Sequence, residues 1–177
     1  VVSMVDSVLL LVDAVDGPMP QTRFVTQKAF EKGLNPILVI NKIDRPSARP
    51  DWVQDQVFDL FDRLGGNDQQ MDFPTIYTSA LNGTSGLDLE KIEEDMSPLL
   101  DLIISKVNEP AVSLEEPFQM QISALDSNSY VGVIGIGRIS RGNVKPNDQV
   151  VVIDAEGKQK TGKILQVLSH EGLERVE

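Results

Sequence analysis

Two unbroken apolar runs near the start of the chain constrain its fold more than any other feature. Residues 8–12 read VLLLV and residues 37–40 read ILVI, with no polar residue inside either run. Continuous apolar runs rich in valine, isoleucine and leucine are typical of strands that are covered on both faces, as in parallel sheets. The segment between the runs must then supply a covering helix. We predict that helix over 21–32, where Gly33 is placed to end it.

The same alternation continues for about seventy further residues. The helix predicted between Pro50 and Gly65 carries apolar residues at helical spacing: Val53, Val57, Leu60, Phe61 and Leu64. A short strand is predicted over 73–77. A further helix follows Ser97, its predicted N-cap, and buries one apolar face: Leu99, Leu102, Ile103 and Val107. Strands alternating with helices predict an α/β fold with a parallel sheet, whose ligands bind beyond the carboxyl ends of the strands.

The apolar pattern changes after Pro110 from helical spacing to strict alternation. Four residues alternate with polar ones: Phe118, Met120, Ile122 and Ala124. Three later runs, YVGVIGIGRI, QVVVID and KILQVLS, are separated by the turn sequences RGN, KPND and AEGK. This pattern predicts a small antiparallel β-barrel, in which Gly132, Gly135 and Gly137 allow sharp coiling or close approach of the backbone. We place the domain boundary within 108–116, giving domains 1–108 and 109–177.

Composition excludes several classes of protein. The 177 residues contain no cysteine, which rules out disulfide scaffolds and thiolate metal sites. The one histidine, His170, is expected at the surface or in a turn, and no metal site is assigned. The longest apolar run is much shorter than the roughly 20 residues that a membrane helix needs. We therefore expect a cytoplasmic protein with no membrane partner.

The charge balance restricts any contact with nucleic acid. The net charge is −11, so a polyphosphate would be repelled by the chain as a whole. The only basic stretch lies in the later part of the sequence, where Arg138, Arg141 and Lys145 are the candidates for contact with RNA. A solvated hairpin face explains them equally well.

The tetrapeptide Asn41-Lys42-Ile43-Asp44 directly follows the second apolar run, at the ligand-binding edge of the predicted sheet. Guanine presents two adjacent donors, N1–H and the N2 amine, and a carboxylate can accept both in charge-assisted hydrogen bonds. We assign that role to Asp44. Adenine would place an acceptor against the same carboxylate and would be rejected. Asn41 is assigned to the N7 edge of the base, and the aliphatic stem of Lys42 to one face of the ring.

A second motif, Thr78-Ser79-Ala80-Leu81-Asn82-Gly83, follows the next predicted strand. Its small residues allow the backbone to approach a flat ring, and the amide of Ala80 can donate to guanine O6, where adenine carries a donor instead. Ser79, Ala80 and Leu81 are therefore predicted to bind the nucleotide together with the first motif.

These motifs resemble the base-specificity motifs of GTPases, and residues 12–22 (VDAVDGPMPQT) resemble the strand and loop that follow switch II in translational GTPases. Four longer runs are similar to BipA/TypA proteins: NKIDRPSARPDWV, FPTIYTSALNGTSGLD, EDMSPLLDLI and SYVGVIGIGRISRGNVKPNDQV. The resemblance implies part of a P-loop-type GTPase sheet followed by the β-barrel known as domain II of translation factors. It also implies GTP or GDP as ligand, GTP hydrolysis in the full-length protein, and a ribosome contact through the barrel.

No GxxxxGK[ST] phosphate loop occurs in the 177 residues. We expect the phosphate loop, the switch regions and the Mg²⁺ ligands of the family to precede Val1, and the last barrel strands to follow Glu177. No catalytic residue is assigned here, and we expect weak nucleotide binding, no hydrolysis by this chain alone, and self-association through exposed sheet edges. Two alternatives stay open: a non-catalytic ribosome- or partner-binding fragment, and an unrelated α/β nucleotide-binding enzyme fused to a barrel.

Overall fold

The computed structural model describes residues 2–130, 132–172 and 174–176. The chain divides into two compact units, Val1–Pro110 and Ala111–Glu177, which are described separately below.

The first unit is built on a five-stranded sheet in the order β1-β2-β3-β4-β5. The strands β1, β2 and β3 are parallel, whereas β4 and β5 continue the sheet in the antiparallel sense. The strand bounds are β1 Ser7–Asp13, β2 Asn35–Asn41, β3 Thr75–Ser79, β4 Thr84–Asp88 and β5 Lys91–Glu93. The helices are η1 Val2–Met4, α1 Pro20–Phe30, α2 Pro50–Arg63, α3 Asp68–Met71 and α4 Ser97–Lys106.

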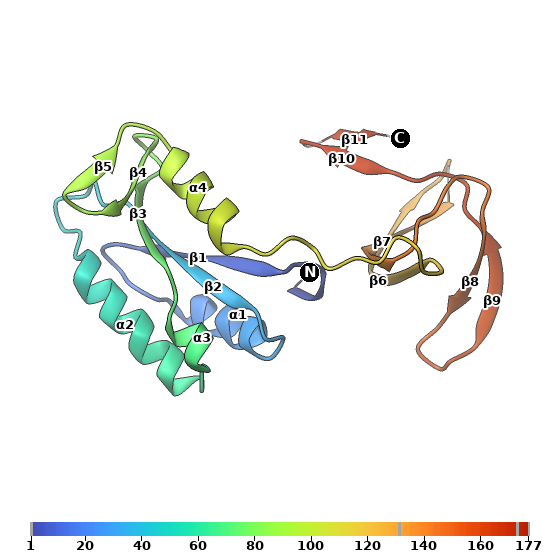
Figure 1. Ribbon diagram of the computed structural model, residues 1–177, viewed down its shortest axis with the longest axis horizontal. Coiled ribbons are helices and arrows are strands. Elements are labelled where there is room, and N and C mark those ends of the chain that lie inside the picture. The colour runs from blue at the N-terminus through green and yellow to red at the C-terminus, as the bar shows by residue number, and fades with distance from the viewer. Residues whose placement is uncertain (1, 131, 173, 177) are drawn as a thin grey trace. The chain divides into compact units, whose positions relative to one another are not determined.

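Helices cover both faces of the sheet, with α1, α2 and α3 on one side and α4 on the other (Figure 1). One core cluster joins alternate residues of β1 and β2 to the buried face of α2: Leu10, Val12, Leu38, Ile40, Val53, Val57 and Phe61. A second cluster joins the opposite face of β2 and β3 to α4: Ile37, Val39, Ile76 and Leu102. The run ILVI is therefore a strand covered on both faces, as predicted. The run VLLLV is also a strand, but the prediction that both its faces are covered was wrong, because Leu9 and Leu11 are exposed.

The strand β1 lies at the edge of this sheet within the described residues. Its side chains alternate between a buried set and an exposed set, and Leu9 and Leu11 are both exposed while Leu10 is buried. The helix α4 packs against β2 and β3 and leaves these two leucines in contact with solvent.

Two local predictions for this unit require correction, and one pair of strands was missed. The strand predicted over 73–77 runs over Thr75–Ser79, because Pro74 has no N–H to donate to a ladder. Ser97 is the first residue of α4 and not its N-cap, and its N–H donates to Asp95 Oδ1 at 2.8 Å. The antiparallel pair β4 and β5 was not predicted, because its short segments carry no apolar run.

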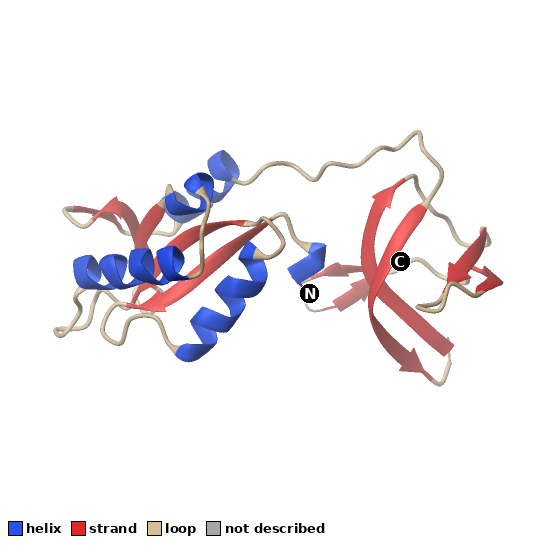
Figure 2. Cartoon of the chain, turned by 90° about the horizontal axis from the view of Figure 1, so that it is seen from below, coloured by secondary structure: helices blue, strands red, loops and turns tan. Residues whose placement is uncertain are grey.

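The second unit consists of antiparallel hairpins, drawn as red arrows in Figure 2. The strands are β6 Gln119–Asn128, β7 Gly132–Arg141, β8 Gln149–Ile153, β9 Gln159–Lys163, β10 Ser169–Glu171 and β11 Glu174–Val176. Among the described residues they form three two-stranded sheets, β6-β7, β8-β9 and β10-β11. The fold class predicted from the sequence is confirmed: a parallel sheet flanked by helices, followed by antiparallel β structure.

The glycine positions of β7 agree with the expected close approach of two backbones. A Cβ atom added at Gly137 would lie 1.9 Å from the carbonyl oxygen of Gln121 on β6, so a side chain cannot be accommodated there. Residue 131, in the run expected to form this strand, lies outside the described residues. His170 pairs with Arg175 across β10 and β11, and its side chain, predicted at the surface, also lies outside the described part.

The run KILQVLS was predicted as a strand, and this was wrong. The strand β9 instead covers the polar segment Gln159–Lys163, and residues 164–168 belong to no named strand. Ile164 is held by backbone hydrogen bonds to the turn before β8, because its carbonyl accepts from the Asn147 N–H at 2.7 Å and its own N–H donates to the carbonyl of Asp148 at 2.9 Å. These bonds take the place of a regular ladder.

No helix in the described ranges has both the length and the apolar character needed to cross a membrane.

The packing of Phe61 gives a prediction about stability. Its ring is fully buried and makes edge-to-face contacts with Phe30 and Phe73, at centroid distances of 5.0 and 4.7 Å. We expect Phe61→Ala to lower the free energy of unfolding by about 3–5 kcal/mol, because it leaves a cavity between helix and sheet. The control is Phe58→Ala on the same helix, which is 50% exposed and should cost less than about 1 kcal/mol. Urea denaturation followed by circular dichroism measures both, and equal losses would contradict the assigned core.

Candidate nucleotide-binding site

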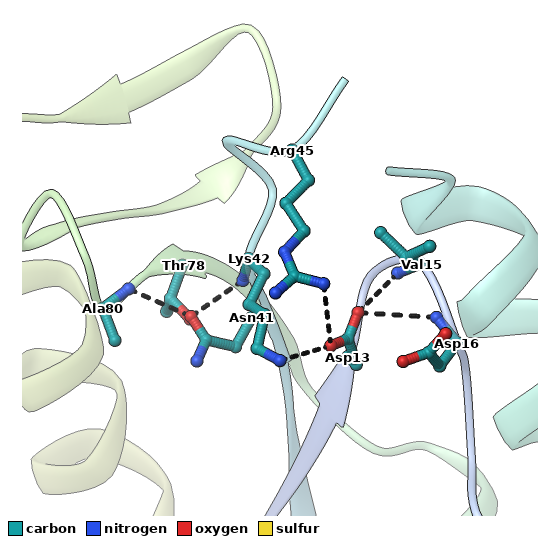
Figure 3. Close-up of polar contacts among 8 residues, drawn as sticks. All are labelled: Asp13, Val15, Asp16, Asn41, Lys42, Arg45, Thr78 and Ala80. Carbon is teal, nitrogen blue, oxygen red and sulfur yellow. Dashed lines mark hydrogen bonds and ion pairs between the residues drawn. The ribbon is translucent and has the colours of Figure 1, made fainter. Parts of the chain in front are cut away.

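The carboxyl ends of the three parallel strands place the two sequence motifs next to each other. Asn41, the last residue of β2, pairs in register with Asp13 at the end of β1 and with Thr78 near the end of β3. The loops that leave these strands therefore begin side by side at one edge of the sheet (Figure 3). Their backbones are also joined, since the Ile43 N–H donates to the carbonyl of Thr78 at 3.3 Å.

The side-chain oxygen of Asn41 holds the two motifs together. Its Oδ1 atom accepts from the backbone N–H of Lys42 at 2.8 Å, from the backbone N–H of Ala80 at 3.0 Å and from the hydroxyl of Thr78 at 3.2 Å. One acceptor thereby satisfies donors from both strand exits. The Nδ2 amide of the same side chain donates to no group in the described part of the chain, and it remains available to an acceptor on a ligand.

Asp44 faces the second motif. Its Oδ1 atom accepts a hydrogen bond of 2.5 Å from the hydroxyl of Ser79, and that hydroxyl also accepts from the backbone N–H of Asn82 at 3.3 Å. Ser79 is buried, whereas Asp44 is exposed. Across the described ranges no donor is bonded to Asp44 Oδ2, so the carboxylate is fixed at one oxygen and open at the other.

Lys42 adopts a left-handed backbone conformation, with φ of +69°. Its Nζ atom lies 2.6 Å from Asp13 Oδ2, and an Arg45 nitrogen lies 3.9 Å from the same oxygen. Asp13 Oδ1 accepts from the backbone N–H of Val15 at 2.8 Å and of Asp16 at 3.4 Å. The hydrogen bond from Lys42, helped by these two amides, lowers the pKa of Asp13 although partial burial opposes the shift.

Two contacts in this region differ from the sequence predictions. The amide of Ala80, expected to face a guanine O6, donates to Asn41 Oδ1, and the Leu81 side chain beside it is 85% exposed. No role was predicted from the sequence for the side chain of Asp13, and its contact with Lys42 was missed. The two residues are 29 positions apart, and only the register of β1 against β2 could have indicated their proximity.

The residues predicted to contact RNA lie in the second unit. Arg138 and Arg141 belong to β7, and Lys145 lies in the turn that follows, where its backbone N–H donates to Asp148 Oδ2 at 2.8 Å. Arg141 forms an exposed ion pair with Glu116 at 2.9 Å. This unit also has an open hollow of about 500 Å³ lined by Pro146, Leu165, Gln166, Val167 and Ser169, which includes none of the candidate nucleotide-binding residues.

Comparison with known proteins first identifies the class of protein to which the chain belongs. The family model of the elongation factor Tu GTP-binding domain matches residues 1–109, and the chain belongs to that family. Translation elongation factor SelB from Methanococcus maripaludis, in its apo form, has a similar fold, with a TM-score of 0.62 at 18% identity over 86% of this chain and 31% of that one.

Curated relatives with high sequence identity narrow the family further. The large ribosomal subunit assembly factor BipA of Haemophilus influenzae and that of Escherichia coli K12 are each 67% identical over 100% of this chain, and the one from Buchnera aphidicola is 60% identical. The resemblance to BipA/TypA translational GTPases found in the sequence is confirmed by these identities. The chain spans 29% of the length of these relatives.

The contact between Asp13 and Lys42 gives a prediction about ionisation. Because the cation favours the charged carboxylate, the pKa of Asp13 should lie below that of an ordinary aspartate, and Lys42→Met should raise it towards that value. A lowered pKa in the folded state means that the contact stabilises the fold at neutral pH, and that this stabilisation is lost as the pH falls through the folded pKa. Carbon-detected NMR titration of the carboxyl group measures both proteins. Lys28→Met, which removes an exposed lysine of α1, is the control and should leave the Asp13 pKa unchanged. An Asp13 pKa that is the same in Lys42→Met as in the original chain would contradict the assigned contact.

Proposed function

We propose that this chain carries the base-recognition half of a guanine-nucleotide site in a ribosome-associated translational GTPase. In this proposal residues 1–108 are the later part of the GTPase domain and residues 109–177 belong to the β-barrel domain. The observation that carries it is the pairing of Asp44 with Ser79 and of Asn41 with Ala80, which brings both sequence motifs to one sheet edge.

Base selection follows from the donors and acceptors left at this edge. Asp44 Oδ2 and the outer lone pair of Oδ1 can accept the N1–H and N2 amine of guanine, while the hydroxyl of Ser79 fixes the carboxylate orientation. The Nδ2 amide of Asn41 can donate to N7. Adenine would leave the carboxylate facing the N1 lone pair, and mismatches of this kind reduce affinity strongly.

The remaining site residues shape the slot. The stem of Lys42 can cover one face of the ring while its ammonium group stays with Asp13. The backbone of Ala80 and Leu81 lies beside O6 in this proposal, because the Ala80 side chain is small and the Leu81 side chain is exposed. The amide of Ala80 is shared between Asn41 and the base. These roles for Asn41, Lys42, Asp44, Ser79, Ala80 and Leu81 are part of the proposal.

Hydrolysis belongs to the whole protein in this proposal. Most nucleotide affinity should come from phosphate and Mg²⁺ contacts, and the chain has neither a phosphate loop nor, in its described part, a cluster of three metal-ligating side chains. Isolated, it should therefore bind GTP or GDP weakly without turnover. A role on the ribosome would place the protein in the cytoplasm.

The base preference can be tested by NMR titration of the 177-residue chain. Guanosine, added to millimolar concentration, should shift the amides of Asn41, Asp44 and Ala80, and adenosine should not. Asp44→Asn should weaken guanosine binding roughly tenfold or more and improve the binding of xanthosine, whose C2 carbonyl needs a donor. Asp55→Asn, the same change at an exposed position of α2, is the control. Equal responses to guanosine and adenosine, or an unchanged preference in Asp44→Asn, would rule out the role of Asp44.

The ribosome contact is proposed for the second unit. Support comes from the relatives, which are large ribosomal subunit assembly factors, and from the basic residues Arg138, Arg141 and Lys145 in a chain of net charge −11. Because phosphate contacts release counterions, their loss should weaken binding and reduce its dependence on salt.

Charge reversal tests this contact. The double variant Arg138→Glu and Arg141→Glu should pellet less with ribosomes, and its binding should vary less with salt than that of the original chain. Arg63→Glu, on the exposed face of α2 in the first unit, is the matched control. Unchanged ribosome binding in the double variant would contradict the proposed contact and favour the interpretation of the two arginines as part of a solvated hairpin face. Loss of ribosome binding without any guanine preference would instead favour the non-catalytic alternative.

A further inference from the structure

Trp52, the one tryptophan of the chain, lies in the first turn of α2 and is 38% exposed. Its ring is covered on one face by the guanidinium of Arg49, 4.0 Å from the ring centroid. It also meets the loop of residues 13–17, because a Cβ atom added at Gly17 would lie 3.1 Å from the Trp52 Cζ3 atom. Gly17 has φ of +71°, so the backbone reaches the indole in a conformation that favours glycine.

Arg49 binds the same loop through two hydrogen bonds. Its backbone N–H donates to the carbonyl of Ala14 at 2.8 Å, and its guanidinium donates to the carbonyl of Val15 at 3.0 Å. The loop closes on itself as well, since the Gly17 N–H donates to the carbonyl of Asp13 at 2.9 Å. Stacking on Trp52 limits the rotamers of the Arg49 side chain and so keeps its guanidinium bonded to the carbonyl of Val15.

The loop carries Asp13 at its first position, and Asp13 holds Lys42. The same carboxylate that accepts from the amides of Val15 and Asp16 accepts from Lys42 Nζ at 2.6 Å. A displacement of loop 13–17 would therefore move the carboxylate away from the ammonium group. The contacts form a continuous chain from the start of α2, through the loop, to the second residue of the base-recognition motif.

We propose that Arg49 and Trp52 are positioning residues for base recognition: they fix loop 13–17 so that Asp13 holds the stem of Lys42 over the face of the purine. This inference rests on the proposed guanine site but concerns a different set of contacts. Arg49 and Trp52 lie five and eight positions beyond Asp44 in sequence, and they act on the site through the neighbouring strand exit. A purely structural role at the start of α2 would stabilise the helix without affecting Lys42.

Two measurements on the full 177-residue chain separate these roles. Arg49→Met should raise the pKa of the Asp13 carboxyl, read by NMR, because Asp13 and Lys42 are no longer held together. The same variant should weaken guanosine binding by about threefold or more, the size expected of a residue that acts through others. Trp52→Phe, which keeps an aromatic face for Arg49, should retain most of both properties, whereas Trp52→Ala should not. Arg63→Met, an exposed arginine at the other end of α2, is the control and should change neither.

The outcomes distinguish this inference from the function on which it rests. If the original chain does not prefer guanosine to adenosine, the guanine assignment fails, and the Asp13 measurement still decides whether Arg49 and Trp52 position Lys42. If guanosine is preferred but Arg49→Met and Trp52→Ala change neither the Asp13 pKa nor the guanosine affinity, the positioning role is overturned. A variant that loses its fold, seen by circular dichroism, is replaced by Gly17→Ala, which displaces the loop and leaves both side chains intact and should reproduce the Arg49→Met result.

Discussion

The hydrogen bonds to Asn41 Oδ1 are the interaction on which the geometry of the candidate site depends. Two parallel strands end next to each other, and a backbone hydrogen bond from the Ile43 N–H to the Thr78 carbonyl joins the segments at their ends. A single side-chain oxygen accepts from Lys42, Thr78 and Ala80 and so fixes both loops relative to the sheet. An acceptor that satisfies backbone donors from two loops is costly to remove, because those donors would then lack a partner. Together with the backbone bond from Ile43 to Thr78, these bonds hold the loops in the positions in which Asp44 and Ser79 meet.

The two aspartates of the candidate site, Asp13 and Asp44, differ in their charged neighbours. The chain is strongly acidic overall, yet the cationic groups of Lys42 and Arg45 converge on Asp13, whose carboxylate is 14% exposed. Asp44, by contrast, is exposed and bonded only to a neutral hydroxyl, so its negative charge is not neutralised by a nearby cation in the described structure. One aspartate therefore serves the internal structure of the site, and the other presents an available charge to a ligand that carries donors.

The sequence was sufficient to predict what depends on local pattern. The runs VLLLV and ILVI, the helix containing Val53 and Phe61, and the position of Asn41 at a strand exit all follow from periodicity and chain order. Contacts between distant residues were not predictable in this way. Asp13 and Lys42 meet because β1 pairs with β2 in a particular register, and Arg49 reaches Val15 because α2 begins beside that loop. The prediction of a strand over KILQVLS was wrong, and Ile164 instead bonds through its backbone to Asn147 and Asp148 in the turn before β8.

An experimental structure of the chain with guanosine bound is the most direct measurement of the central claim. It should place N1 and N2 of the base roughly 2.7–3.0 Å from the carboxylate oxygens of Asp44, with O6 towards residues 79–81 and N7 near the Asn41 amide. A base bound elsewhere on the chain, or an Asp44 side chain turned away from the base, would contradict it.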